Sequence, residues 1–486
     1  MGRIEIMLRT LSERYSRLSL PARAGIWFTL CSIVQRGISV LSMPVFTRLL
    51  STEAYGEYSL YTSWCMLFSL VITLNLSSEV FNKGLVDHEA DRPAYSTCQA
   101  GLITALVLCF YFAYIVFHRV VDDLTGMDMV LTSLMFLEIY STAIVGLWYA
   151  RKRFEFEYRS LIAVTLGISL CSVLFGIAAV SIAPPSLKVV ARVASNALPF
   201  FVVASVVLVR FVRESSKVCS RGWWAQSIRL GIPLVPHYAS QVLLNQADKM
   251  LISRFLDNSK VAIYGIAHSA GLLLTMVNNG INSAFVPWLY SHLEREDYDP
   301  IGRIANALSA LVLALVFLLM LFAPECVALL ATEEYQEAVW SIPPIATGVV
   351  FAFMYTLFVN VEIYYGETGY VAVASIASAV INVILNIIAI PVFGYIASAY
   401  VTSACYLATA VFHYAFMRRA LRKTGVRARI YDARFLGWLC AATLLCSCGA
   451  VSLYAEPMLR YGAICILVIV MAVSKNRVAR LFSSMR

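Results

Sequence analysis

The sequence predicts an all-α polytopic membrane protein of about fourteen transmembrane helices. Of its 486 residues, 60% are hydrophobic and only 14% are charged, and the mean hydropathy is +0.75. A soluble domain carries about 25% charged residues. The apolar residues form long runs, and the runs repeat between the two halves of the chain. This repeat predicts two six-helix lobes, related in parallel around a central cavity, plus two C-terminal helices.

Each helical span needs about 20 apolar residues. Runs of this length lie at 25–45, 56–78, 98–117, 129–150, 161–182, 188–210, 230–252, 261–286, 303–323, 338–360, 370–390, 395–416, 434–454 and 459–474. An even number of spans returns both termini to the same side of the membrane.

The positions of Lys and Arg set the orientation, because cytoplasmic loops carry the excess of these residues. With a cytoplasmic N-terminus, 29 of the 38 Lys and Arg fall in cytoplasmic segments, six in outside loops and three within spans. Both termini are therefore expected in the cytoplasm. The net charge of +9 is explained by this distribution, so it does not indicate nucleic-acid binding.

The internal repeat sets the expected organisation. The segment from Arg48 (RLLSTEAYGEY) after the first span is echoed from Arg254 (RFLDNSKVAIYGIA) after the seventh, and Pro184 is echoed by Pro391. Six spans separate these points, and an even number makes the repeats parallel. We expect a cytoplasmic N-terminal segment (1–24), an N-lobe (25–212), a cytoplasmic linker (213–229), a C-lobe (230–417), a basic cytoplasmic loop (418–433), and two further helices with a C-terminal tail (434–486).

The seventh span carries the most polar face. Its residues Gln241, Asn245 and Asp248 share one side of the helix, and Lys249 follows directly. A charge at the centre of a lipid-exposed helix costs about 2.5–3.5 kcal/mol, so such residues normally face a bundle interior or a water-filled path. The pair is either part of a transport site or an ion pair that only holds the bundle together.

Three charged residues interrupt spans of the N-lobe. Gln35 and Arg36 lie in the middle of the first span, Glu138 lies in the fourth and Arg192 lies near the outer end of the sixth. An arginine keeps its charge, so Arg36 must pair, reach the interface or face water. It is either a cavity residue or the structural partner of Glu138, and Arg192 is either a cavity residue or an interfacial anchor.

Asparagine and serine also line faces of the eighth and eleventh spans, at Asn279 and Asn282 and at Ser378, Asn382 and Asn386. Such side chains either bond helix to helix or line a polar lumen. No P-loop, GxSxG or HExxH motif occurs, so an enzyme is not expected. The twelve cysteines include no CxxC pair, so neither a disulfide framework nor a metal site is expected.

Three segments resemble one protein family. PVFTRLLSTEAYGEYSLY (Pro44–Tyr61), NQADKMLISRFLDNSKVAIYGIA (Asn245–Ala267) and INVILNIIAIPVFGYIASAY (Ile381–Tyr400) are similar to bacterial polysaccharide exporters, the Wzx-type flippases. These belong to the multidrug/oligosaccharidyl-lipid/polysaccharide exporter superfamily. The resemblance implies alternating access around a basic cavity. It implies translocation of an undecaprenyl-pyrophosphate-linked oligosaccharide, such as an O-antigen, capsule or exopolysaccharide repeat unit, across the bacterial inner membrane.

On this interpretation, Arg36 and Lys249 attract pyrophosphate or acidic sugar, while Asp248 and Glu138 hold these cations or exchange a proton. The expected cavity residues are Gln35, Arg36, Glu138, Gln241, Asn245, Asp248, Lys249, Asn279 and Asn282, with Arg48, Arg192 and Arg254 at the outer rim.

No cofactor is expected, and H⁺ and Na⁺ are the candidate coupling ions. The expected partners are the lipid-linked oligosaccharide and the bilayer, with polysaccharide polymerase and chain-length machinery as candidates and no nucleic acid. The alternative function is a cation-coupled multidrug or metabolite antiporter of the same fold, and a third is a scaffold that transports nothing.

Overall fold

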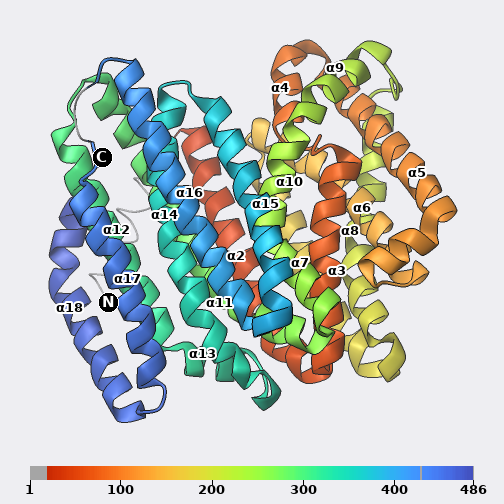
Figure 1. Cartoon of the computed structure of the whole chain (residues 1–486). Helices are drawn as coiled ribbons and strands as arrows, with labels where there is room; N and C mark the ends of the chain where they lie inside the picture. The colour runs from red at the N-terminus through yellow and green to blue at the C-terminus, as the bar shows by residue number, and fades with distance from the viewer. Residues whose placement is uncertain (1–18, 427–429, 485–486) are drawn as a thin grey trace, which may run out of the picture. The chain divides into compact units, whose positions relative to one another are not determined.

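The computed structural model describes residues 19–426 and 430–484, and every regular element within these ranges is a helix (Figure 1). The predicted all-α membrane fold is confirmed. Twelve of the described helices are long and apolar enough to cross a membrane. The helices at the second and seventh predicted spans, α3 (Thr52–Thr73) and α10 (Val235–Phe255), are not among these twelve.

The contacts divide the described chain into two units. The N-unit comprises residues up to Ser51 together with Trp64–Pro236, and the C-unit comprises Thr52–Ser63 together with the chain from His237 onward. The helix α3 therefore begins in the C-unit and ends in the N-unit. Its first half is held within the C-unit by the Ser63 hydroxyl, which donates to Gln246 Oε1 at 2.9 Å.

The N-unit is built mainly on the packing of α8 against α6 and α7, with α2 against α7. Its helices are α2 (Leu20–Leu49), the end of α3, α4 (Glu79–Asp87), η1 (Glu89–Asp91), α5 (Arg92–Thr125), α6 (Met129–Phe154), α7 (Tyr158–Ile182), η2 (Pro185–Leu187), α8 (Lys188–Glu214), α9 (Arg221–Gly231) and η3 (Ile232–Leu234).

The C-unit is built around α14, most of whose span is buried between α11, α12 and α16. The last two helices pack on α12, and α17 also contacts α14. Its helices are α10, α11 (Asn258–Glu294), α12 (Asp299–Leu321), α13 (Ala323–Leu330), η4 (Glu333–Ser341), α14 (Ile342–Tyr364), α15 (Thr368–Phe393), α16 (Ile396–Lys423), α17 (Ala433–Leu453) and α18 (Pro457–Ser484).

Local chemistry sets several helix ends. Asp128 accepts a hydrogen bond from the backbone of Leu131 at 2.8 Å and begins α6, and Asp257 accepts from the backbone of Lys260 at 2.9 Å and begins α11. These N-caps satisfy donors that the first turn leaves unpaired. Gly126 ends α5 in the left-handed region (φ 70°), which a residue without a Cβ adopts at little cost.

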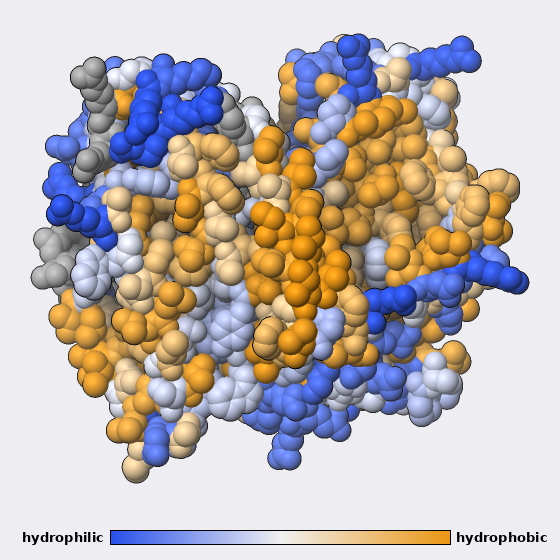
Figure 2. All heavy atoms as spheres, in the orientation of Figure 1, coloured by the Kyte–Doolittle hydropathy of each residue, from blue (hydrophilic) through white to orange (hydrophobic). Residues whose placement is uncertain are grey.

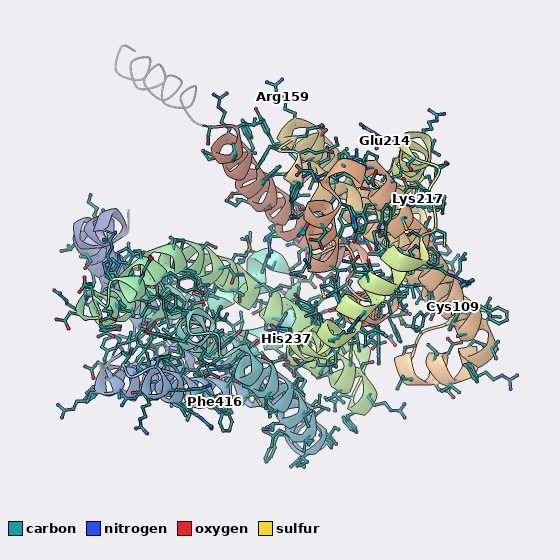
Figure 3. All side chains as sticks on the ribbon, turned by 90° about the horizontal axis from the view of Figure 1, so that it is seen from above. Cys109, Arg159, Glu214, Lys217, His237 and Phe416 are labelled. Carbon is teal, nitrogen blue, oxygen red and sulfur yellow. The ribbon has the colours of Figure 1, made fainter. Side chains whose placement is uncertain are left out.

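Within each unit, segments predicted to be cytoplasmic lie together. In the N-unit, Arg151 contacts both Glu155 and Glu214, which joins the end of α6 to the end of α8; Figure 3 labels Glu214 there. In the C-unit, Lys423 pairs with Glu367 at 2.6 Å. On each unit, Figure 2 shows an apolar surface band with hydrophilic residues beyond it. This is the pattern of a chain that crosses a bilayer.

Candidate functional site

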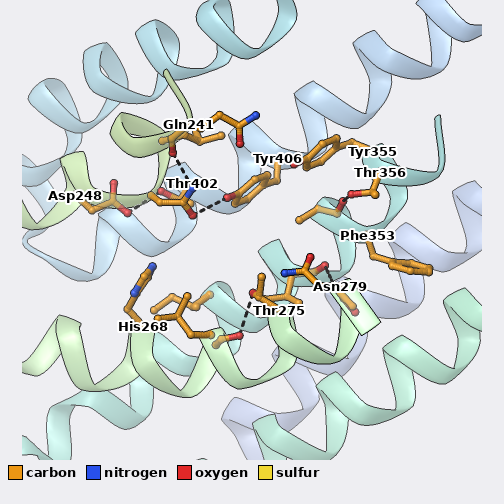
Figure 4. Close-up of a pocket in the computed structure, with 18 of the residues that line it drawn as sticks. Gln241, Asp248, His268, Thr275, Asn279, Phe353, Tyr355, Thr356, Thr402 and Tyr406 are labelled. Carbon is orange, nitrogen blue, oxygen red and sulfur yellow. Dashed lines mark hydrogen bonds between the residues drawn. The ribbon is translucent and has the colours of Figure 1, made fainter. Parts of the chain in front are cut away.

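A polar cavity of about 250 Å³ lies within the C-unit (Figure 4). Four helices form it: α10, α11, α14 and α16. The polar lining comprises Gln241, Asn245, Asp248, Tyr264, His268, Thr275, Asn278, Asn279, Asn282, Tyr355, Thr356, Thr402 and Tyr406. Among these, Asp248 is the one carboxylate. Amides, hydroxyls and aromatic rings dominate the surface, which is the chemistry that recognises sugars or other hydroxyl-rich groups.

Asp248 is held by three donors from three other helices. Its carboxylate accepts from the Tyr264 hydroxyl on α11, from Asn386 Nδ2 on α15 at 2.9 Å and from the Thr402 hydroxyl on α16 at 2.8 Å. Only 2% of Asp248 is exposed. Hydrogen bonds to a charged group contribute about 1.5–3 kcal/mol each. Three of them together offset a burial cost of several kcal/mol, so the carboxylate does not depend on a salt bridge.

Lys249 does not form the ion pair that one interpretation of the sequence requires. Adjacent residues on a helix point about 100° apart, and the ammonium makes no hydrogen bond or ion pair with any described residue. It is nevertheless buried, and it acts electrostatically on both Asp248 and His268. Lys249 therefore places an amine without an ion-pair partner among the described residues beside the cavity, although it is not among the lining residues.

The asparagines of α11 divide between the two roles that the sequence left open. Asn278 donates to the backbone oxygen of Val349 at 3.1 Å, and Asn282 accepts from Asn360 Nδ2 at 2.7 Å, so both join α11 to α14. Asn279 is exposed and makes no side-chain hydrogen bond to a described residue. Asn279 is therefore the member of this face that is available to a ligand.

On α10, Asn245 accepts from the Tyr406 hydroxyl at 3.2 Å, and its Nδ2 donates to the backbone oxygen of Gln241 at 2.8 Å. Both Gln241 and Asn245 line the cavity together with Asp248. Five of the predicted cavity residues thus share one site: Gln241, Asn245, Asp248, Asn279 and Asn282.

The predicted site residues of the N-unit are arranged differently. Glu138 accepts from Asn196 Nδ2 at 2.7 Å, which joins α6 to α8. Arg192 is buried, and its guanidinium lies 4.1 Å from the centre of the Phe46 ring. Arg36 is exposed on α2 and makes no hydrogen bond or ion pair with a described residue, so it is not the partner of Glu138. Gln35 beside it is half-buried.

Arg48 and Arg254 occupy equivalent places, because each lies in the last turn of its helix, α2 and α10 respectively. Both are exposed. Arg48 Nη1 donates to the backbone oxygen of Pro44, one turn earlier in the same helix, at 2.7 Å. Position and exposure agree with a place at the end of a span, which is where the sequence placed both residues.

The sequence did not single out Tyr264, Thr402 or the buried pair Glu362 and His413. Glu362 falls just beyond the predicted end of the tenth span at residue 360, whereas α14 continues to Tyr364. Its side chain is 0% exposed and His413 is 1% exposed. A histidine inside the twelfth apolar run was the available signal for this pair. Tyrosine and threonine in a span carry no such signal, because they are also common where they contact only helices.

Comparison with known proteins identifies the family. The family model described as polysaccharide biosynthesis protein matches residues 22–293, which is more than half of the chain. The chain belongs to the polysaccharide biosynthesis protein family. A second model, MatE, matches residues 233–388, which include α10, α11, α14 and part of α15. The polysaccharide biosynthesis match covers the N-unit helices and the Asp248 segment.

The curated relative that this comparison found is distant in sequence. It is "Lsg locus putative protein 1" of Haemophilus influenzae, 21% identical over 377 residues that cover 71% of this chain and 85% of the relative.

Among solved structures, the lipid II flippase MurJ in an inward closed conformation has a TM-score of 0.66 at 10% identity, covering 93% of this chain and all of that one. An inward-facing multidrug MATE transporter of the MOP superfamily has a TM-score of 0.60 at 14% identity, covering 83% of this chain and all of that one. At these identities the likeness shows a shared fold.

Proposed function

We propose that this protein is a flippase that moves an undecaprenyl-pyrophosphate-linked oligosaccharide from the cytoplasmic to the periplasmic leaflet of a bacterial inner membrane by alternating access. The glycan would be a repeat unit of O-antigen, capsule or exopolysaccharide, which a polymerase and chain-length machinery then use. Family membership supports the substrate class. The structural observation behind the residue assignments is the polar cavity of the C-unit, beside which Lys249 lies without an ion-pair partner among the described residues.

The size of the cavity limits what it holds. Small-molecule pockets commonly measure about 300–1,000 Å³, so about 250 Å³ accommodates one sugar or a headgroup and not a whole oligosaccharide. Asn279 offers both an amide donor and an acceptor to such a group. The stacked rings of Tyr355 and Tyr406, 6.1 Å apart, give the cavity an aromatic wall.

Charge provides the second support. A buried ammonium without an ion-pair or hydrogen-bond partner costs several kcal/mol, and an anion that reaches it recovers much of that cost. His268 lies within electrostatic reach of Lys249, and its Nδ1 is buried without a partner among the described residues. Lys249 and the exposed Arg36 are the cations that we assign to attracting pyrophosphate or acidic sugar.

Asp248 is the group that we assign to coupling. A carboxylate that faces a polar cavity from a membrane-spanning helix exchanges a proton or holds a small cation such as Na⁺. Asn386, Tyr264 and Thr402 surround it with oxygen and nitrogen ligands that can reorient around either ion. The choice between H⁺ and Na⁺ is made by measuring export in proteoliposomes with one gradient at a time.

Deleting the gene tests the flippase. We expect loss of the surface glycan and accumulation of its lipid-linked unit on the cytoplasmic leaflet, measured by glycan staining and by protection of the lipid-linked unit from periplasmic glycosidase. Complementation with the wild-type chain should restore export. Unaltered surface glycan in the deletion strain would overturn the proposal.

A cation-coupled antiporter is the second candidate, because the cavity contains a carboxylate and the MatE model matches the segment that contains it. An organic cation would bind near Asp248, whereas the adjacent Lys249 would repel it. In the deletion strain, heightened sensitivity to cationic dyes with normal surface glycan would favour this function. A scaffold that transports nothing should tolerate loss of the deep charges altogether.

A further inference from the structure

A second acid of the C-unit lies in a sealed environment outside the cavity. Glu362 on α14 and His413 on α16 face each other, with His413 Nδ1 3.0 Å from Glu362 Oε1 and 3.2 Å from Oε2. Their side chains are 0% and 1% exposed. They lie where α14 and α16 make the most extensive helix contact of the unit.

The charge of this pair depends on one proton. With a neutral imidazole, Nδ1–H donates to the carboxylate and the pair carries a net charge of −1. Adding a proton gives either imidazolium with carboxylate or imidazole with carboxylic acid, and both are neutral. A net charge in a site without water costs several kcal/mol. The sealed arrangement therefore favours the state with the extra proton, shared by the two residues as a unit.

No other counter-charge competes for this proton among the described residues. The Tyr355 ring stacks on His413 at 5.8 Å, and the Phe416 ring packs edge-on at 6.4 Å. His413 is the one charged group that acts on Glu362.

Apart from each other, Glu362 and His413 make no hydrogen bond or ion pair with a titratable group among the described residues. The other titratable groups on the packed elements are Lys260, Tyr264, His268, Tyr290, His292 and Glu294 on α11, Asp299 and Arg303 on α12, Glu333, Glu334, Tyr335 and Glu337 on η4, Tyr355 and Tyr364 on α14, Tyr400, Cys405, Tyr406, Tyr414, Arg418, Arg419, Arg422 and Lys423 on α16, and Arg434, Cys440, Cys446 and Cys448 on α17. The described side chains of α15 include no acid, base or tyrosine.

Glu362 and His413 lie at the same spacing from the cavity residues on their two helices. Tyr355 and Tyr406 line the cavity from α14 and α16, and Glu362 and His413 each follow seven residues later on the same two helices. Seven residues are about two turns, or about 10 Å along the helix. Because Tyr355 stacks on both Tyr406 and His413, a movement that separates the helices at the cavity also disturbs the packing over the pair.

We propose that Glu362 and His413 form a proton-binding site, distinct from Asp248, that is filled while the contact between α14 and α16 is sealed and releases its proton when water enters that contact. The role of this proton in transport rests on the flippase function proposed above, whereas its binding does not. In the binding step, the free lone pair of the imidazole or the carboxylate takes a proton from hydronium and leaves water. The release step is the reverse.

Proton counting on the purified full-length protein tests the binding. The pH of a weakly buffered detergent solution is stepped from 10, where the pair is emptied, to 5.5, and the protons taken up per chain are measured for wild type and for Glu362→Gln/His413→Gln. We expect the double variant to take up about one proton fewer. The matched control is Glu367→Gln, which removes a carboxylate paired with the exposed Lys423. An ordinary glutamate titrates near pH 4.3, so this control should take up the same number as wild type.

Equal proton uptake by wild type and the double variant would overturn the proposal. If the double variant fails to fold, the swapped variant Glu362→His/His413→Glu keeps the pair, and it should take up the wild-type number of protons. A swapped chain that folds and lacks this proton would also count against the site.

Glycan export as a function of external pH separates this inference from the flippase function. We expect Glu362→Gln to flatten the pH dependence of export while Glu367→Gln retains it. If export is absent even in wild type but the difference in proton uptake persists, the flippase function fails and the proton site stands. If export by Glu362→Gln follows the wild-type pH profile, the site plays no part in transport and that part of the inference is wrong.

Discussion

The N-lobe and the C-lobe each contain six predicted spans, but the two units place their charged clusters differently. In the C-unit, the four charged or titratable side chains Asp248, Lys249, Glu362 and His413 are all buried within helices. In the N-unit, the main ion-pair network lies at a helix end, where Arg151 and Lys152 contact glutamates of neighbouring segments.

Repeated helices thus do not imply repeated chemistry. Counting back 207 residues, the spacing of Pro184 and Pro391, puts Leu41 at the place that corresponds to Asp248. The N-unit instead offers an exposed arginine on its first helix, at Arg36. Under the proposed flippase function, this difference is the reason for assigning the coupling ion to the C-unit and a positive charge for the anionic substrate to the N-unit.

The largest expected effect comes from removing one carboxylate from each unit. Asp248→Asn keeps the shape but loses one acceptor oxygen that Tyr264 and Thr402 share, so we expect export to fall by more than about tenfold, or 1.4 kcal/mol. Glu138→Gln keeps an acceptor for Asn196, and more than about half of the export should remain. Surface glycan per cell, normalised to membrane protein, measures both. Equal losses would show that both units depend on a deep acid.

The relation between Asp248 and Lys249 gives a second test. If the two only neutralised each other, Asp248→Asn/Lys249→Gln would leave no stranded charge and would recover export. Because Asp248 is held by Tyr264, Asn386 and Thr402 and not by Lys249, we expect no recovery. Lys249→Arg should keep part of the activity, since the charge remains while its geometry changes. Wild-type export from the double variant would reduce the pair to a structural role.

Arg36 tests the contribution of the N-unit. We expect Arg36→Ala to lower export about tenfold while the protein remains in the membrane. The variant removes one of the positive side chains that attract an anionic substrate. The matched control is Arg159→Ala, which removes an exposed arginine from the predicted cytoplasmic side (Figure 3). Immunoblots of membrane fractions establish the amount of each variant. Unchanged export from Arg36→Ala would show that the cationic side chains that attract the substrate lie only in the C-unit.

The smallest expected effect concerns the charge network of the N-unit. Burial tends to raise the pKa of Glu155, but hydrogen bonds from Lys152 and Arg151 outweigh it and hold that pKa below the usual value. A lowered pKa stabilises the folded state above the unfolded pKa near 4.3. This contribution is lost as the pH falls through the folded pKa.

The melting temperature in detergent between pH 3 and 7 measures this effect. Glu155→Gln should lower the stability by about 1 kcal/mol or less at pH 7. Its stability should also change less than that of wild type as the pH falls below 4.3. A variant that follows the wild-type pH dependence would show that Glu155 does not hold the network together.

The pattern of apolar and charged residues was enough to predict the fold class of this protein and the order of its spans. Long apolar runs leave few alternatives to membrane-spanning helices, since a bilayer offers no partner to an open backbone. The polar face of the seventh span was also readable, because Gln241, Asn245 and Asp248 recur at helical spacing and each is costly in lipid. These three residues line one cavity in the structure.

The contacts that those residues make depend on how the neighbouring helices pack, which the sequence pattern does not report. Helical spacing places Asp248 on a face, but its donors Tyr264, Asn386 and Thr402 come from three other helices, and nothing in the spacing of one helix reports the register of its neighbours. For the same reason the ion pair suggested by adjacent Asp248 and Lys249 is absent. Glu362 and His413 lie 51 residues apart in sequence and become one site only through the packing of α14 on α16.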